Sequence, residues 1–225
     1  MDRDVFIARV AARLGRSAAA GGTVAPPAIE LPRARAATAR ADGSERPTEF
    51  ERPTEAEIRE ELLGLFATRL EEAGGLVVRA TSREEALAAV ARVAREKGVT
   101  GFACPPSLRW PATDDLWTED LRNADFGLSE AEWGIAATGS VVLRHGGERG
   151  RSYSLLPPVA GFLLPASRVV RGSGSVLAQL GDGTEPLPAC VPFVTGPSHS
   201  GDIAGVMCRG VHGPAEVRVW LIGDE

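Results

Sequence analysis

The sequence predicts an α/β fold with a parallel sheet core and some antiparallel additions. Capped amphipathic segments alternate with short apolar runs through the middle of the chain, as helices alternate with strands in α/β proteins. Short loops join the first strand, the helix after it and the next strand, which favours a right-handed parallel unit. Farther on, two short apolar segments flank Thr138-Gly139, and this pattern favours a tight turn between strands.

Each element follows from local signals. Thr54 with Glu57, and Ser82 with Glu85, have the spacing of capping boxes, and each pair precedes an amphipathic segment, so each is expected to begin a helix. The other predicted elements are strands at Leu76–Val78, Thr100–Cys104, Val159–Leu164, Ala189–Val194 and Val217–Ile222, a loop with a short helix at 105–130, and a helix at 173–181.

The chain is predicted to form one domain preceded by an arm. Residues 4–15 have amphipathic helical spacing, and this helix either packs on its own domain or docks on a partner protein. Residues 16–53 nearly lack large apolar side chains, as flexible linkers do. The prediction is therefore a helix and flexible arm at 1–53 and an α/β domain at 54–225.

Composition argues against several classes of partner. The chain has 225 residues, of which 44% are hydrophobic, and a net charge of -5. This acidic balance argues against nucleic acid as a partner and against a basic membrane-binding face. No apolar run is long enough to span a bilayer, and the N-terminus lacks the apolar core of a signal peptide, so the cytoplasm is the expected compartment.

The cysteines and histidines predict no metal site. Cys104, Cys190 and Cys208 are widely spaced and form no CxxC pair, so they are expected to be small buried apolar groups. The histidines form neither an HxxxH nor an HExxH motif, which leaves a metal site without support. His145 is expected in a solvated loop, and His212 is expected to fix a turn.

The segment Thr195–Ile203 is the first candidate for binding chemistry. It places glycine, proline, hydroxyls and a carboxylate between two apolar runs. One of Ser198, Ser200 or Asp202 is expected to cap a short helix, whose free backbone N–H groups would hold a phosphate or carboxylate. The alternative is that these residues only shape a loop.

Two further groups are candidates. Arg149 and Arg151 lie in a glycine-rich segment, where they would either clamp an anion or form a solvated hairpin tip. Glu132 precedes Trp133, and it is either an acid–base group or an ordinary surface carboxylate.

Several of these segments together resemble the LUD domain of the lactate utilisation protein C (LutC) family. The resemblance covers roughly residues 55–225, and the order and spacing of its motifs make it specific. The matching motifs are Ile135–Ser140, Leu155–Pro158, Thr195–Ser198 with Asp202-Ile203, and Gly210–Pro214.

The resemblance implies a sheet core like that of the NagB/RpiA/CoA-transferase group, with flanking helices. It also implies an accessory role in oxidising L-lactate to pyruvate, with no cofactor in this chain and with partner proteins that carry iron–sulfur clusters. The alternative is a stand-alone enzyme acting on a phosphorylated or CoA-linked metabolite, in which Glu132 or Asp202 would be the acid–base group.

Combined with the segments above, the resemblance yields one expected cleft that binds a small anionic ligand or a partner. Its ligand-binding residues are Thr138, Gly139, Ser140, Arg149, Ser154, Thr195, Gly196, Ser198 and His212. The chain departs from the family at two places: members often have an acidic residue at the position of Ala137, and many have a histidine at that of Ala160. Any chemistry that those side chains perform is therefore absent here.

Overall fold

The computed structural model describes residues 53–146, 150–181, 186–203 and 206–223, and the side chains of 201–207 are not among those described. The predicted helix at 4–15 and the arm that follows it lie outside the described residues. In the described part of the chain, no helix is both long and apolar enough to cross a membrane.

Both predicted long helices form, and their caps differ in one detail. Helix α2, Glu55–Glu72, begins with the expected capping box, in which Thr54 and Glu57 exchange hydrogen bonds. Helix α3, Arg83–Glu96, begins at Ser82, whose side chain accepts a bond from the Glu85 amide. The Glu85 carboxylate accepts bonds from Thr81 instead of Ser82, so the second predicted capping box is only half formed.

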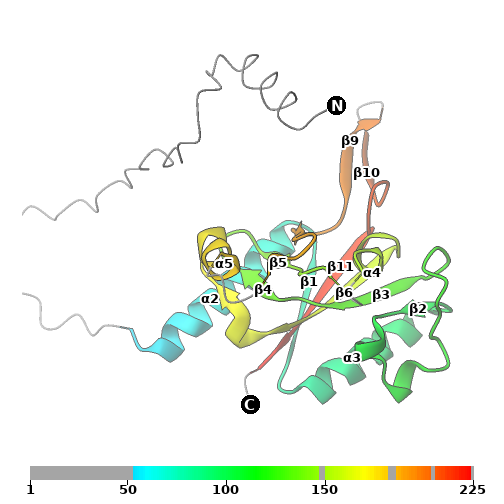
Figure 1. The fold of residues 1–225 in the computed structure, drawn as a ribbon, viewed down its shortest axis with the longest axis horizontal. Coiled ribbons are helices and arrows are strands. Elements are labelled where there is room, and N and C mark those ends of the chain that lie inside the picture. The colour runs from blue at the N-terminus through cyan, green and yellow to red at the C-terminus, as the bar shows by residue number, and fades with distance from the viewer. Residues whose placement is uncertain (1–52, 147–149, 182–185, 204–205, 224–225) are drawn as a thin grey trace, which may run out of the picture. The chain divides into compact units, whose positions relative to one another are not determined.

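The core is a five-stranded parallel sheet in the order β1-β11-β6-β3-β2 (Figure 1). Its strands are β1 Leu76–Ala80, β2 Phe102–Ala103, β3 Phe126–Glu130, β6 Val159–Pro165 and β11 Glu216–Ile222. Every neighbouring pair is parallel, so the α/β class and the parallel core are confirmed.

Strand β3 corrects the prediction of a loop and a short helix at 105–130. This segment contains two short 3-10 helices, Pro106–Leu108 and Pro111–Thr113, followed by the strand. Phe126 pairs with Val159 of β6 and with Phe102 of β2. The strand therefore lies inside the sheet, and its carboxyl end is at Glu130.

A second sheet supplies the antiparallel additions. It has the order β7-β4-β5-β8, and its strands are β4 Trp133–Ile135, β5 Ser140–Val142, β7 Val169–Val170 and β8 Phe193–Val194. The tight turn expected at Thr138-Gly139 connects the antiparallel pair β4 and β5. The strand expected at 189–194 is limited to the last two of those residues and is not buried. The residues before it bond to the segment after β5 through the Pro192 and Cys190 carbonyls, but Pro192 has no amide proton to continue the ladder.

The two faces of the central sheet have separate cores. On one face, Phe66 of α2 and Val141 of β5 pack with Phe162 and Val219 of the central strands. On the other face, α3 packs over Trp220, Phe102 and Phe126, whose rings are near neighbours. The predicted helix at 173–181 forms as α5, Ser173–Leu180, and covers the outer side of the second sheet through Val176. Figure 1 shows α3 and α5 on opposite sides of the central strands.

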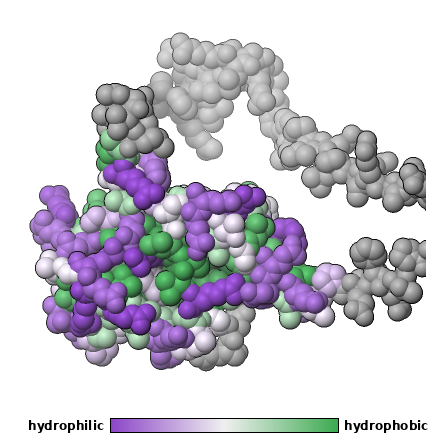
Figure 2. Space-filling model, turned by 180° about the vertical axis from the view of Figure 1, so that it is seen from behind, coloured by the Kyte–Doolittle hydropathy of each residue, from purple (hydrophilic) through white to green (hydrophobic). Residues whose placement is uncertain are grey.

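A two-stranded hairpin, formed by β9 His199–Ile203 and β10 Val206–Arg209, projects from the domain (Figure 1). Figure 2 shows the opposite side of the molecule, where an apolar area near the middle is bordered by hydrophilic residues. The large apolar side chains that the structure leaves exposed are Leu76, Leu155, Leu156, Leu177, Leu187, Phe193 and Val211.

Asp125 closes the loop that leads into β3. Its carboxylate accepts hydrogen bonds from the Thr100 amide at 2.8 Å, the Thr100 hydroxyl at 2.9 Å and the Gly101 amide at 3.0 Å. The bonds from Thr100, followed by the bond from Gly101, hold the pKa of Asp125 below its ordinary value of 3.8. The charged carboxylate therefore stabilises the folded state.

We expect Asp125→Asn to lower the free energy of unfolding by about 1–2 kcal/mol at pH 7, because an amide accepts these bonds less well. A lowered pKa means that the contribution is present above pH 3.8 and is lost as pH falls through the still lower folded value. Urea titrations between pH 2 and 7 should show the gap between wild type and variant closing in acid. Glu61→Gln, on an exposed part of α2, is the control, and a gap independent of pH would contradict this account.

Candidate functional site

The structure brings three of the predicted ligand residues together. The Ser140 hydroxyl lies 2.7 Å from that of Thr138 and 2.5 Å from that of Thr195. Strand β5 contributes Ser140, and the segment after β8 contributes Thr195. Thr195 is far from the other two in the sequence, and the pairing of β5 with β8 joins all three into one row of hydroxyls.

The two glycines beside this row allow close packing against a helix. Gly139 has φ +65° and Gly196 has φ +78°. A Cβ on Gly139 would lie 2.2 Å from the Leu70 amide nitrogen, and one on Gly196 would lie 2.5 Å from the Ala73 carbonyl oxygen. Both positions therefore face the C-terminal end of α2, whose partial negative charge disfavours an anion. Anion binding by this row of hydroxyls stays a prediction, and the nearby C-terminal end of α2 does not favour it.

The remainder of the Thr195–Ile203 loop differs from the prediction. No helix follows Ser198, because β9 begins at His199, so the expected helix start and its free N–H groups are absent from this loop. Backbone bonds hold Ser198 to Pro214 and Gly210, at the base of the hairpin. His212 is exposed nearby, and the side chain of Asp202 is not among those described.

His199 is held by a hydrogen-bond network that the sequence did not predict. Its Nδ1 lies 2.9 Å from the Pro197 carbonyl oxygen, and its Nε2 lies 3.1 Å from Nε of Arg209. Because the guanidinium can only donate, Nε2 must accept and Nδ1 must carry the proton. The imidazole thus ties the two strands of the hairpin together.

The arginine-rich segment contributes less than expected to this cleft. Arg149 lies outside the described residues. Ser154 is buried, but its hydroxyl donates to the Arg151 carbonyl at 3.0 Å within the short helix α4, Ser152–Leu155. Ser154 therefore has a local structural partner, and its ligand role stays a prediction.

Glu132 lies where the chain leaves the central sheet for the second sheet. Its carboxylate is 3.7 Å from Arg168, and that of Glu130 is 2.6 Å from Arg83. These two ion pairs border a groove of about 210 Å³ whose floor includes Leu163. The groove lies at the carboxyl ends of the strands, where α/β proteins commonly bind ligands.

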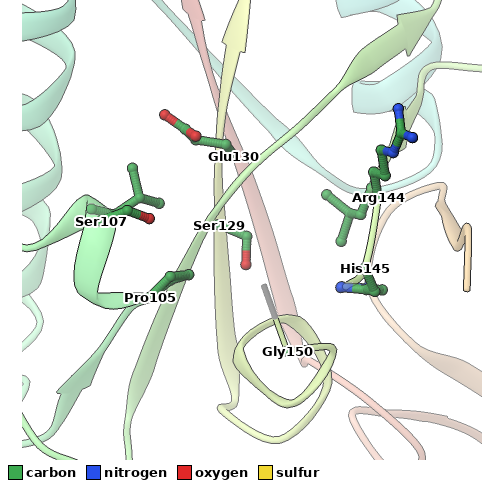
Figure 3. A pocket seen from close by; sticks show the side chains of 9 residues that line it. Pro105, Ser107, Ser129, Glu130, Arg144, His145 and Gly150 are labelled. Carbon is green, nitrogen blue, oxygen red and sulfur yellow. The ribbon is translucent and has the colours of Figure 1, made fainter. Parts of the chain in front are cut away.

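A second hollow, which the sequence did not predict, lies beside the first, with Glu130 shared between them. Its lining residues are Pro105, Ser107, Leu108, Ser129, Glu130, Leu143, Arg144, His145 and Gly150. Figure 3 shows the Ser129 hydroxyl and the His145 ring directed into it, with Arg144 directed away. His145 is buried, so the prediction of a solvated histidine is wrong. The apolar run Val141–Leu143 just before His145 could have indicated its burial, because such a run leads the chain into the core.

The two positions at which the resemblance implies a departure from the family have different surroundings. Ala137 is exposed beside the Thr138-Gly139 turn. Ala160 is fully buried, between Gly127 of β3 and Val217 of β11. A histidine at the position of Ala160 would require the core to repack.

The cysteines are distributed over three separate parts of the fold. Cys104 follows β2, Cys190 precedes β8 and Cys208 lies in β10. Burial raises the pKa of the Cys104 thiol to about 11, whereas the other two are partly exposed, which corrects the expectation that all three are buried. Among the described residues, no group of three or more His, Cys, Asp or Glu side chains could hold a metal ion.

Comparison with known proteins finds matches to one family model and to several relatives. Residues 107–222 match the family model of the LUD domain. Lactate utilization protein C of Halalkalibacterium halodurans is 34% identical over 132 residues, which cover 56% of this chain and 57% of that protein. Lactate utilization protein C of Bacillus licheniformis is 28% identical over an alignment of 252 positions, which covers 99% of this chain and 97% of that protein. The matches to several other relatives span about half of their length.

One solved structure has a similar fold. It is a DUF162 family protein from Deinococcus radiodurans, with a TM-score of 0.54 and 22% sequence identity over 73% of this chain and 98% of that chain. At this identity the likeness concerns the fold alone.

Proposed function

The chain belongs to the LUD domain family, and from that membership we propose that it takes part in the utilisation of lactate. The observation that carries the proposal is the match to lactate utilization protein C of Bacillus licheniformis, because it spans 99% of this chain and 97% of that protein. A match over both whole lengths supports a shared role better than a match confined to one shared module.

Within that role, we propose that the chain is an accessory, non-redox subunit that works with iron–sulfur proteins. Its three cysteines lie in separate elements, and the thiol of Cys104 has a pKa of about 11, so that this thiol is protonated at neutral pH. These features support a division of labour in which the partner subunits carry the clusters and oxidise L-lactate to pyruvate.

One observation favours a second candidate function. The groove between the ion pairs of Glu130 and Glu132 is large enough for a small metabolite and is rich in charge. A stand-alone enzyme acting on a phosphorylated or CoA-linked metabolite would use Glu132 there as its acid–base group. Sugar phosphates and CoA esters should then raise the melting temperature of the purified protein.

Deletion of the gene tests the proposed role. We expect the deletion strain to lose growth on L-lactate, to grow normally on pyruvate and to recover when this chain is expressed from a plasmid. Growth on pyruvate is the matched control, because it lies beyond the proposed oxidation step. Normal growth of the deletion strain on L-lactate, in a genome without a second copy, would contradict the proposal.

A further inference from the structure

Two polar side chains more than nine-tenths buried point into the hollow at the carboxyl end of β3. Ser129 and His145 are each 7% exposed, and Figure 3 shows both directed into the same space. Phe126 and Leu128 face the core beneath α3. Because side chains alternate along a strand, Ser129 points to the other face of the sheet, toward the segment that follows β5.

The Ser129 hydroxyl has no hydrogen-bond partner within the part of the chain that the structure describes. Its oxygen is not sealed in the core but is accessible from the hollow, so that water or a ligand can bond to it there. Most buried polar groups in folded proteins are satisfied by protein atoms or ordered water. We therefore expect the hydrogen-bond partner of the Ser129 hydroxyl to lie in the hollow.

The lining of the hollow is partly polar and partly apolar. Ser107, which is exposed, adds a second hydroxyl to it, and Pro105, Leu108 and Leu143 add apolar surface. The Glu130 carboxylate at the edge points away from the Ser129 hydroxyl (Figure 3) and is paired with Arg83 at 2.6 Å. The lining therefore presents hydroxyls and an imidazole, which bind oxygen atoms, together with apolar surface that suits a methyl group.

The size of the hollow limits what it can hold. Its cavity volume is about 20 Å³, against about 210 Å³ for the neighbouring groove. A volume of this size holds roughly one water-sized group. One oxygenated end of a small molecule fits inside, and the rest of the molecule lies in the mouth.

We propose that this hollow binds a three-carbon 2-hydroxy or 2-oxo acid, with an oxygen on Ser129 and His145 and the methyl group on Leu108 and Leu143. The ligand class rests on the proposed function, whereas the place rests on the buried hydroxyl. Ser129 is then a binding residue of this site. This position differs from the hydroxyl row at Ser140 and from the Thr195–Ile203 loop.

Titration of the purified full chain with L-lactate, pyruvate, propionate and inorganic phosphate, followed by ligand-observed NMR and calorimetry, tests the proposal. We expect L-lactate or pyruvate to bind, and propionate, which lacks the 2-oxygen, to bind more weakly. Ser129→Ala should weaken binding at least fivefold. Its melting temperature without ligand should change little, because the hydroxyl that the variant removes bonds to no other described residue. Ser175→Ala, on the exposed side of α5, is the matched control and should bind like wild type.

The proposal is overturned if neither acid binds, if phosphate alone binds, or if Ser129→Ala binds as wild type does. It is also overturned if Ser198→Ala, and not Ser129→Ala, abolishes binding, since the ligand would then occupy the loop. The growth test is independent of the binding test. If the deletion strain loses growth on lactate but the purified chain binds neither acid, this site is rejected and the proposed role stands. If the chain binds an acid but the deletion strain grows normally on lactate, the proposed role is rejected and the site stands.

Discussion

Replacing Gly139 by alanine is expected to lower the free energy of unfolding by about 2–4 kcal/mol. The residue has φ +65°, and a Cβ would lie 2.2 Å from the Leu70 nitrogen and 2.5 Å from the Arg69 carbonyl carbon. The left-handed backbone costs an alanine about 1 kcal/mol, and the forced displacement of helix backbone adds about 1–3 kcal/mol. Urea denaturation followed by circular dichroism measures the loss.

Gly98→Ala separates the two causes. Gly98 has φ +66°, but nothing lies within 4 Å of the position of its Cβ. This variant should therefore lose only about 1 kcal/mol, the backbone contribution. Equal losses in the two variants would mean that the close approach of Gly139 to α2 is not a constraint on the fold.

Gly139 also illustrates what the sequence can and cannot predict about a site. The turn at this position follows from the two flanking apolar segments, and the structure confirms it. Those flanking segments do not indicate that the glycine packs against α2, because this helix lies about 70 residues earlier in the chain. A glycine that lets a helix approach and one that lets a ligand approach have the same local pattern.

Most of the fold was predictable because its signals are local. The capping box at Thr54 begins α2, and the apolar run at 159–164 forms β6. Strand β3 was missed because only Phe126 and Leu128 alternate there with Gly127 and Ser129, and so short an alternation is a weak signal for a strand. Without that strand, the carboxyl end at Ser129 could not be placed beside other residues.

The candidate hollow was missed for a related reason. Ser129 and His145 meet only because the chain leaves β3, makes the β4–β5 turn and returns beside the strand it left. The histidine lies next to glycines and arginines, which are usually found in solvated loops. Its burial follows from its backbone bond to the Cys190 carbonyl, at 3.0 Å, in a distant segment, and no spacing within either segment indicates this pairing.

Replacement of Trp220 by alanine is the second variant with a large expected effect. The side chain is fully buried in β11, and its ring centroid lies 6.3 Å from that of Phe126. Removing a buried aromatic side chain costs about 3–5 kcal/mol through lost burial and the cavity left behind. Chemical denaturation should show this loss, whereas Leu177→Ala, on an exposed side chain of α5, should change stability by about 0.5 kcal/mol or less.

Trp220→Phe distinguishes the contribution of ring packing from that of the indole N–H. Among the described residues, no atom accepts a hydrogen bond from the Trp220 Nε1, so phenylalanine removes an unsatisfied donor together with part of the ring. We expect it to recover more than half of the stability lost by the alanine variant. Because Trp220 packs beneath α3 and Ser129 faces the opposite side of the sheet, Trp220→Phe should retain the ligand binding proposed for the hollow. A Trp220→Phe variant as unstable as Trp220→Ala would mean that the indole makes a polar contact essential to this core.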